Sequence, residues 1–360
     1  MLLWLGYKNK QAARQQQKWT LQGELPNLSI IVAFRNEEMS IPQLLEGLGN
    51  LNYPNEKLEI ILINDHSEDS SAHLVNHWIS KNNNRIFKLF HSPEGKTGKK
   101  AALEFAVKNV SGDWLLFTDA DCEIHPNWPN QMVVCQQNSG AEMVCGQVAI
   151  KVGNWKENLE ALEFSSLIAV GASGITINKP SLCNGANFMI SRSAHQEAQL
   201  LRSDQNLASG DDVFLLHTLK KLNRRIVFCF VPFSEILINP TDSWNTFEQQ
   251  RLRWASKWKS GLSGGNQNLA IVVWFFHLLF LATLCGLLWN LRIREAFFIT
   301  VLKAAIESQF LELFLPHRSY IKSMNYILWA QFLYSFYVIY FGLKVLFSNQ
   351  YTWKGRPIRY

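Results

Sequence analysis

Short apolar runs alternate with helix-like stretches through the first part of the chain. Leu28–Phe34 and Leu58–Asn64 are rich in Ile, Leu and Val, as strands buried on both faces of a sheet are. Between them Ser40 precedes Ile41-Pro42, a favourable helix start with proline in the first turn. Trp114–Thr118 supplies a further strand. The alternation predicts an α/β fold with a mainly parallel sheet.

The pattern becomes less regular after these strands. Ser67, followed by two acids that complement a helix dipole, predicts another helix start. Gly171–Gly174 and Asn184–Asn187 are predicted to be flexible turns, and Arg225–Val231 returns to the strand pattern. No internal repeat is visible in the sequence. One α/β domain over about residues 20–240 is therefore expected.

Apolar residues dominate from Leu269 onward. Leu269–Leu291 contains no Asp, Glu, Lys or Arg and is long enough to span a bilayer at about 1.5 Å per residue. Tyr326–Phe347 carries only Lys344, close enough to its end to snorkel. We predict membrane helices and a tail within residues 269–360, preceded by an interfacial segment over residues 241–268.

A third apolar stretch, residues 296–315, is ambiguous. It carries Lys303, Glu307 and Glu312, so an interfacial or bundle-facing helix and a third span both fit. The basic tail over residues 353–359 favours the cytoplasmic side, which two later crossings would satisfy and three would not. We therefore expect a multi-pass protein of the cell (inner) membrane with its α/β domain in the cytoplasm.

Charge and cysteine usage agree with this placement. The net charge of +6 includes Lys and Arg residues that flank the apolar segments. Residues 1–19 begin with an apolar stub too short to cross, followed by a basic polar linker, or they are the end of a helix that begins further upstream. The six cysteines lack C-x-x-C spacing and are expected to be reduced thiols. An anionic membrane surface, and not nucleic acid, is the expected partner.

Thr118-Asp119-Ala120-Asp121 is the most informative motif. A strand carries side chains i and i+2 on one face, so both carboxylates point the same way if the strand persists through Asp121. A divalent cation, Mg²⁺ or Mn²⁺, would then bind between them. A helix cap or a turn is the alternative interpretation of an isolated D-x-D triplet.

Polar loops follow the first two strands, at residues 33–38 and 64–69. Such loops bind nucleosides in parallel α/β sheets, and we select Asp65 for this contact, although capping of the next helix explains it equally well. Gly95–Leu103 is a glycine-rich turn entering a helix, but it departs from the P-loop because Lys100 follows Lys99. Lys99 suits a diphosphate, with a solvated charge as the alternative.

Two further motifs lie closer to the apolar segments. Asp211 and Asp212 follow Gly210 at a predicted helix start, where an acid is either an N-cap or, beside a nucleotide, a general base. The stretch Gln250-Arg251-Leu252-Arg253-Trp254 offers a guanidinium for phosphate oxygens and an indole for a sugar face. A simple interfacial amphipathic helix would have a similar sequence.

Taken in order, these five motifs resemble those of the family 2 glycosyltransferases, inverting enzymes with the Rossmann-like GT-A fold. The resemblance covers about residues 28–260, and its Q-x-x-R-W element is typical of the membrane-bound branch. It implies a UDP-sugar donor, a divalent cation at Asp119 and Asp121, and Asp212 as general base supported by Asp211. The diphosphate and acceptor sugar would meet Gln250, Arg253 and Trp254. The implied nucleotide-sugar contacts are Ala33, Arg35, Glu37, Asp65, Lys99 and Asp119.

The sequence departs from the family pattern at two points. Asn64 stands where many relatives have a first acid, and Asp211 replaces the commoner Glu. The resemblance implies transfer of a sugar to a lipid acceptor (polyprenyl, glycerolipid, sphingolipid or carotenoid type) or to a polysaccharide, and the few predicted spans favour a lipid. Oligomers are compatible with this hypothesis. The alternative is a catalytically silent nucleotide-sugar-binding scaffold of an envelope complex. A small transporter is disfavoured because no inverted helical repeat is visible.

Overall fold

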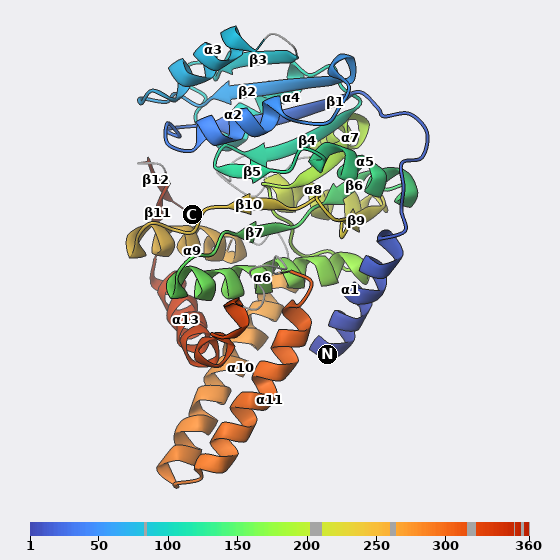
Figure 1. Ribbon diagram of the computed structural model, residues 1–360. Coiled ribbons are helices and arrows are strands. Elements are labelled where there is room, and N and C mark those ends of the chain that lie inside the picture. The colour runs from blue at the N-terminus through green and yellow to red at the C-terminus, as the bar shows by residue number, and fades with distance from the viewer. Residues whose placement is uncertain are drawn as a thin grey trace. The chain divides into compact units, whose positions relative to one another are not determined.

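The chain forms two compact units in a computed structural model (Figure 1). The sheet unit comprises residues 10–148 and 171–239, and the helical unit comprises residues 1–9, 149–170 and 240–360. The structure describes residues 1–82, 85–201, 211–259, 264–314, 322–348, 350–353 and 356–359.

A seven-stranded sheet organises the sheet unit, with strand order β3-β2-β1-β4-β8-β6-β9. The first four strands in this order are mutually parallel, β8 is antiparallel to both β4 and β6, and β6 and β9 are parallel. The mainly parallel sheet predicted from the sequence is confirmed. Its strands are β1 (Leu28–Phe34), β2 (Leu58–Asn64), β3 (Ile86–His91), β4 (Trp114–Asp119), β6 (Met143–Cys145), β8 (Phe188–Ser191) and β9 (Ile226–Phe228).

Helices and a small second sheet accompany the main sheet. The second sheet has the order β5-β10-β7, formed by Cys122–Ile124, Ile236–Ile238 and Val148–Ile150. The helices are α2 (Ile41–Gly49), α3 (Ser71–Lys81), α4 (Lys99–Lys108), α5 (Trp128–Ser139), α7 (Arg192–Leu200) and α8 (Asp211–Lys221), with the 3-10 turn Asn55–Lys57 before β2. The proline at the start of α2 lies in its first turn as predicted.

Glu59 joins the amino ends of the central strands. Its carboxylate accepts hydrogen bonds from Ser29 Oγ at 2.5 Å, from Ser111 N at 2.5 Å and from Lys88 Nζ at 2.8 Å. Burial by itself would raise the pKa of Glu59, but these donors together lower it to about 2. The residue therefore remains ionised inside the sheet unit and fixes β1, β2 and β3 relative to one another.

Several expectations for the sheet unit are wrong in detail. The third helix begins at Ser71, not at Ser67, because the Ser67 side chain accepts a hydrogen bond from Asn36 N at 3.1 Å and belongs to the preceding loop. Strand β3 was not anticipated, since Lys88 and His91 interrupt the continuous apolar run that marks a doubly buried strand. Gly171–Gly174 is not a turn but part of helix α6 (Trp155–Thr176).

The polar stretch expected to be a linker near Gln15-Gln16-Gln17 is largely helical. It forms the end of α1 (Leu2–Gln16), and Gln16 is buried. The Gln16 side chain donates to Phe228 O at 2.8 Å and accepts from Phe230 N at 2.6 Å. A polar side chain is buried here because both halves of its amide have backbone partners.

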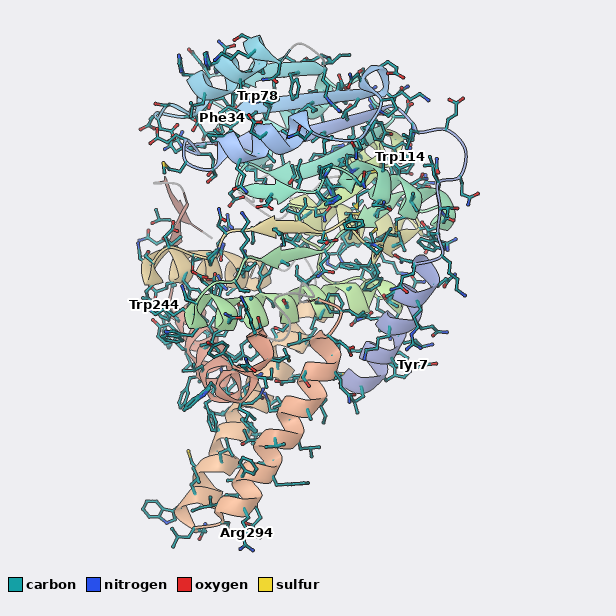
Figure 2. The ribbon with its side chains drawn as sticks, in the orientation of Figure 1. Tyr7, Phe34, Trp78, Trp114, Trp244 and Arg294 are labelled. Carbon is teal, nitrogen blue, oxygen red and sulfur yellow. The ribbon has the colours of Figure 1, made fainter. Side chains whose placement is uncertain are left out.

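The helical unit contains long apolar helices. Figure 1 shows α10 and α11 side by side, and Figure 2 labels Arg294 close to the turn that joins them. The tail forms an antiparallel hairpin of β11 and β12, although Lys354 and Gly355 lie outside the described residues. The remaining elements are α9 (Trp244–Lys259), α10 (Gly264–Trp289), α11 (Ile293–Leu311), α13 (Ile327–Phe347), β11 (Gln350–Trp353) and β12 (Arg356–Arg359).

Among the described residues, three helices are long and apolar enough to cross a membrane. Two of them, Asn268–Trp289 within α10 and Ile327–Phe347, match the predicted spans. The third is α6, which was not predicted as a span and is mostly buried within the protein. Helix α11, the ambiguous third stretch, is not among the candidates. Its Lys303 is buried in an ion pair with Glu307 at 2.7 Å, as a bundle-facing helix requires.

Candidate functional site

The carboxyl ends of β1, β2 and β4 meet at one edge of the sheet. Ala33 pairs with Asp119 across β1 and β4, and Phe34 pairs with Asn64 across β1 and β2. Ala33 is half-buried, whereas the other residues of β1 are buried. The register therefore brings the loops that carry the nucleotide-sugar candidates to the same edge, where open α/β sheets bind ligands.

Asp65 is almost completely buried just after β2. Its two carboxylate oxygens both accept a hydrogen bond from Gly98 N, at 3.0 and 3.1 Å. Gly98 has a φ of 101°, a backbone conformation that favours glycine, and it is the N-cap residue of α4. Helix α3 has Ser70 as its N-cap residue, so the capping role considered for Asp65 does not apply to the next helix. Asp65 instead joins the β2 loop to the glycine-rich turn.

Arg35 joins the first two polar loops. Its guanidinium donates to Asp65 O at 3.0 Å, to His66 O, and to Glu68 Oε1 at 2.7 Å. Glu37 follows in the same loop, and its backbone N–H donates to Ser71 Oγ at 2.7 Å. Arg35 is buried, so its contacts hold the two loops together and position the neighbouring Asp65.

Strand β4 ends at Asp119, and Ala120 and Asp121 form a turn before β5. The strand does not continue through Asp121, so the alternation of a strand does not decide where this carboxylate points. Asp119 is half-buried and forms an ion pair with Lys99 from the start of α4, while Asp121 is exposed. Burial, together with the charges of Asp121 and Asp119, raises the pKa of the neighbouring Cys122 thiol.

The carboxylates of Asp119 and Asp121 suit a hard divalent cation. Within the described part of the chain, no group of three or more His, Cys, Asp or Glu side chains is arranged to hold a metal ion. Mg²⁺ sites in phosphoryl enzymes often use only one or two carboxylates and take further ligands from substrate phosphates. The donor set therefore fits a cation that is shared with a diphosphate and does not resemble a closed structural site.

Asp212 lies in the first turn of α8, which begins at Asp211. Its Oδ1 accepts a hydrogen bond from Val213 N at 2.9 Å. Gly185 lies close to the same carboxylate, and a methyl group added there would come within 3.3 Å of Asp212 Oδ2. Gly210, the first residue of the G-D-D motif, lies outside the described residues. Both acids lie in this helix, and the residues before them lie outside the described residues, so their place at a helix start stays a prediction.

The loop beside Asp212 is fixed by Asn187, a residue that the sequence did not single out. Asn187 is fully buried, and its side chain donates to Gln147 O at 2.8 Å and to Ser234 O at 2.9 Å. Trp128 Nε1 in turn donates to Asn187 Oδ1 at 3.0 Å. The stretch Asn184–Asn187 is a turn, as predicted, but this buried amide holds it in place.

The Q-x-x-R-W stretch lies on α9 in the helical unit. Its most buried polar member is Arg251, which forms ion pairs with Glu163 and, at 3.4 Å, with Glu160 of α6. The guanidinium lies 3.9 Å from the Phe247 ring centre and 4.6 Å from that of Trp254. Burial by itself would lower the pKa of Arg251, but the two carboxylates raise it.

The predicted residues of this stretch are arranged around Arg251. Gln250 Oε1 accepts a hydrogen bond from Arg251 Nη1, Trp254 contacts Phe164, and Arg253 is half-buried on the same helix. Arg251 was not singled out from the sequence because it occupies a position that the motif leaves unspecified, and its partners Glu160 and Glu163 lie outside the motif. The available signal was a pair of acids three residues apart, Glu160 and Glu163, immediately before the apolar part of helix α6.

Two family models match the chain. The model described as glycosyl transferase family 2 matches residues 29–198, and the model described as glycosyl transferase family group 2 matches residues 114–347. The chain belongs to glycosyl transferase family group 2. The second match extends from β4 through α13, so in this glycosyl transferase chain it covers the later part of the sheet unit and the apolar helices.

The chain is also similar to named bacterial proteins. It is 28% identical over 244 residues to the probable glycosyltransferase YdaM of Bacillus subtilis, covering 64% of this chain and 55% of that protein. It is 33% identical over 138 residues to the beta-monoglucosyldiacylglycerol synthase of Trichormus variabilis, covering 38% and 29%. With the poly-beta-1,6-N-acetyl-D-glucosamine synthase of Staphylococcus aureus it shares 34% identity over 110 residues, covering 31% and 25%. The match thus spans about half the length of the first of these relatives and less than a third of the other two.

One solved structure has the same fold over nearly the whole chain. It is the mannosyltransferase PcManGT from Pyrobaculum calidifontis, in complex with GDP-Man and Mn²⁺. The TM-score is 0.57 at 16% sequence identity, and the match covers 94% of this chain and 99% of that one. The expected GT-A fold, an α/β fold with a mainly parallel sheet and apolar helices in its C-terminal half, is therefore confirmed.

Proposed function

We propose that the chain is a membrane-bound, inverting glycosyltransferase that transfers a sugar from a UDP-sugar to a lipid or polysaccharide acceptor of the cell envelope. The observation that carries the proposal is the meeting of Asp65, Lys99 and Asp119 at the carboxyl edge of the sheet, within the match to the family model. Asp65 would contact the nucleoside, and Lys99 would offset the charge of the diphosphate.

The reaction is a single displacement at the anomeric carbon. An acceptor hydroxyl oxygen forms the new bond to this carbon while the bond to the diphosphate oxygen breaks, and UDP leaves with the bonding electrons. The hydroxyl proton passes to the Asp212 carboxylate, supported by Asp211. Attack from the face opposite the leaving group inverts the configuration. Lys99 and Arg253 would stabilise the charge that develops on the leaving diphosphate.

The proposal includes a divalent cation held by Asp119 and Asp121. When bound, this cation would neutralise diphosphate charge and so make UDP a better leaving group. The fit of the two carboxylates to a phosphate-completed site supports this assignment. That the similarly folded mannosyltransferase was determined with GDP-Man and Mn²⁺ agrees with the same class of ligands. Ala33, Arg35 and Glu37 would complete the donor site, and Gln250 and Trp254 the acceptor side.

The exposed apolar helices support a membrane location. Phe275, Leu279, Trp329 and Phe336 are among the large apolar side chains of α10 and α13 that face outward, and such surface is costly in water. Together with the basic tail, these helices favour a protein of the inner membrane with its sheet unit in the cytoplasm. The named relatives include a glycolipid synthase and a polysaccharide synthase, so both acceptor classes enter the proposal.

A transfer assay tests the proposal. The purified full chain is incubated with radiolabelled UDP-sugars and a membrane lipid extract, and label in the organic phase and in polymer is counted. We expect transfer from at least one UDP-sugar, and loss of about 10²–10⁴-fold in turnover for Asp212→Asn with UDP binding retained. UDP-sugar binding without turnover would instead support the catalytically silent scaffold. Mass spectrometry of envelope lipids and polysaccharides after gene deletion would identify the acceptor.

A further inference from the structure

The helical unit carries a large cavity, open to its surroundings, that the proposed reaction does not involve. Its volume is about 1680 Å³, and every residue that lines it belongs to the helical unit. Apolar side chains of α10, α11 and α13 form most of the wall, including Val273, Phe280, Leu302 and Leu333. A space of this size and character accommodates hydrocarbon chains.

Acidic side chains outnumber basic ones in the lining of the cavity. Five carboxylates line it, those of Glu157, Glu160, Glu163, Asp242 and Glu307. Two ammonium groups line it, those of Lys156 and Lys303. The acids remain in excess even when Arg251, the ion-pair partner of Glu160 and Glu163, is counted with the bases. The cavity as a whole is therefore acidic.

The buried cation of the cavity is already neutralised. Lys303 is 8% exposed, and its ammonium group lies 2.7 Å from Glu307 Oε1 and 2.5 Å from Gln331 Oε1. A lipid phosphate would have to break this pair or place its own charge beside the carboxylates. Either event is unfavourable in surroundings of low dielectric constant.

The same groups suit a neutral hydroxyl. Glu160 Oε2 accepts hydrogen bonds from Thr241 N at 3.1 Å and from Thr241 Oγ1 at 3.0 Å, and Glu163 Oε1 accepts from Tyr337 Oη at 2.9 Å. These carboxylates and hydroxyl groups line the cavity next to apolar surface. A ligand with a hydrocarbon body and an uncharged hydroxyl head would match both parts of this lining.

We propose that this cavity binds the acceptor of the reaction, and that the acceptor is an uncharged lipid with a free hydroxyl group, such as a diacylglycerol. The role of this lipid as an acceptor rests on the proposed glycosyltransfer, but lipid binding itself does not require turnover. It selects a neutral lipid over a polyprenyl phosphate because the cavity is acidic and its buried Lys303 is paired.

Photolabelling of the full chain in phosphatidylcholine nanodiscs tests the site. A diacylglycerol with a diazirine in one acyl chain is the probe, no nucleotide sugar is added, and labelled peptides are identified by mass spectrometry. We expect label on the lining segments of α10, α11 and α13. Val273→Trp, which places a bulky ring in the cavity wall, should lower the yield about fivefold or more. Leu279→Trp is the matched control, because Leu279 is 63% exposed on the same helix and does not line the cavity.

Competition tests the choice of lipid. Unlabelled diacylglycerol should reduce the labelling, and polyprenyl phosphate at the same mole fraction should reduce it about tenfold less effectively. Glu307→Gln removes one carboxylate and leaves Lys303 without its ion-pair partner, so it should improve competition by polyprenyl phosphate. Equal or stronger competition by polyprenyl phosphate in the unmodified protein would overturn the inference. Labelling that is unchanged in Val273→Trp would also overturn the inference, because the probe would then have labelled the helices from the surrounding bilayer and not from the cavity.

A parallel measurement separates this inference from the proposed function. UDP-sugar turnover is measured with the same preparations, and the melting temperature of each variant confirms that it is folded. Specific labelling without turnover by any donor would refute the glycosyltransfer and leave a neutral-lipid site. Turnover without specific labelling would leave the glycosyltransfer and refute the site.

Discussion

The ammonium group of Lys99 forms an ion pair with the carboxylate of Asp119 at the edge of the sheet. The first residue of α4 thus contacts the last residue of β4, and both side chains are about one-third exposed. Because Lys99 is available to solvent on one side, it can serve an incoming diphosphate while it remains close to the acidic turn. The pair connects the glycine-rich turn with the carboxylates that would hold a cation.

Replacement of Lys99 by Met should weaken donor binding. The variant loses the cation that would offset diphosphate charge, and about a tenfold or larger increase in the dissociation constant of UDP is expected. Isothermal titration calorimetry in the presence of Mn²⁺ measures this change. Lys108→Met is the matched control, since Lys108 is exposed at the other end of the same helix. Equal loss of affinity in both variants would contradict a specific role for Lys99.

Gly185→Ala should disturb catalysis without disturbing donor binding. The added methyl group would lie 3.3 Å from Asp212 Oδ2, so the carboxylate must shift by a few tenths of an ångström. A displaced general base is expected to lower kcat about tenfold. Initial-rate measurements at saturating donor test this, with UDP affinity as the second readout. A variant with unchanged kcat would show that Asp212 tolerates displacement and would weaken its assignment as the base.

Arg251 and Arg253 should differ in what they do. Arg251→Met leaves Glu160 and Glu163 without their buried ion-pair partner, and a loss of about 3–5 kcal/mol in the free energy of unfolding is expected. Addition of Glu163→Gln should recover part of this loss. Arg253→Met should instead lower transfer with little change in stability. Thermal melts in detergent and transfer assays on both variants test this prediction. Loss of stability in Arg253→Met together with loss of transfer alone in Arg251→Met would contradict it.

Acid should remove the stabilisation that Glu59 provides. Its pKa in the folded protein is about 2, below the ordinary value of 4.5, so its ionised form stabilises the fold above about pH 4.5. This contribution is lost as the pH falls towards 2. Glu59→Gln should therefore be less stable than the unmodified protein by about 1–3 kcal/mol at pH 7, with a smaller difference below pH 4.5.

Melting temperatures measured across this pH range test the prediction for Glu59. Glu24→Gln is the control, because Glu24 pairs with Lys57 at 2.9 Å but its side chain is 91% exposed. This variant should be as stable as the unmodified protein at every pH. A difference between Glu59→Gln and the unmodified protein that stays constant from pH 7 to pH 3 would contradict the assigned pKa.

The sequence predicted those parts of the fold that depend on local patterns. Strands β1, β2 and β4 are continuous apolar runs, and α10 and α13 are long apolar helices, so both kinds of element were evident. Strand β3 was missed because it is only half-buried and carries Lys88. The start of α3 was misplaced because Ser67 serves a neighbouring loop, which local propensity does not reveal.

The candidate site residues were likewise predictable only where their positions follow from the strand pattern. The edge that unites Ala33, Asp65 and Asp119 could be anticipated, because parallel strands place their carboxyl ends together. The contacts of Gly98 with Asp65 and of Gly185 with Asp212 could not be anticipated from the sequence, because they depend on loop conformation. Buried partners such as Asn187 and Arg251 were missed because long-range packing gives polar residues their role.

The dependence of transfer on a divalent cation tests the central claim most directly. Transfer from a radiolabelled UDP-sugar by the purified full chain is measured after EDTA treatment and again after addition of Mn²⁺, in parallel with Asp121→Ala. We predict that EDTA abolishes transfer, that Mn²⁺ restores it, and that Asp121→Ala weakens the Mn²⁺-dependent binding of UDP. Transfer that persists at full rate in EDTA, or Mn²⁺-dependent UDP binding unchanged by Asp121→Ala, would contradict it.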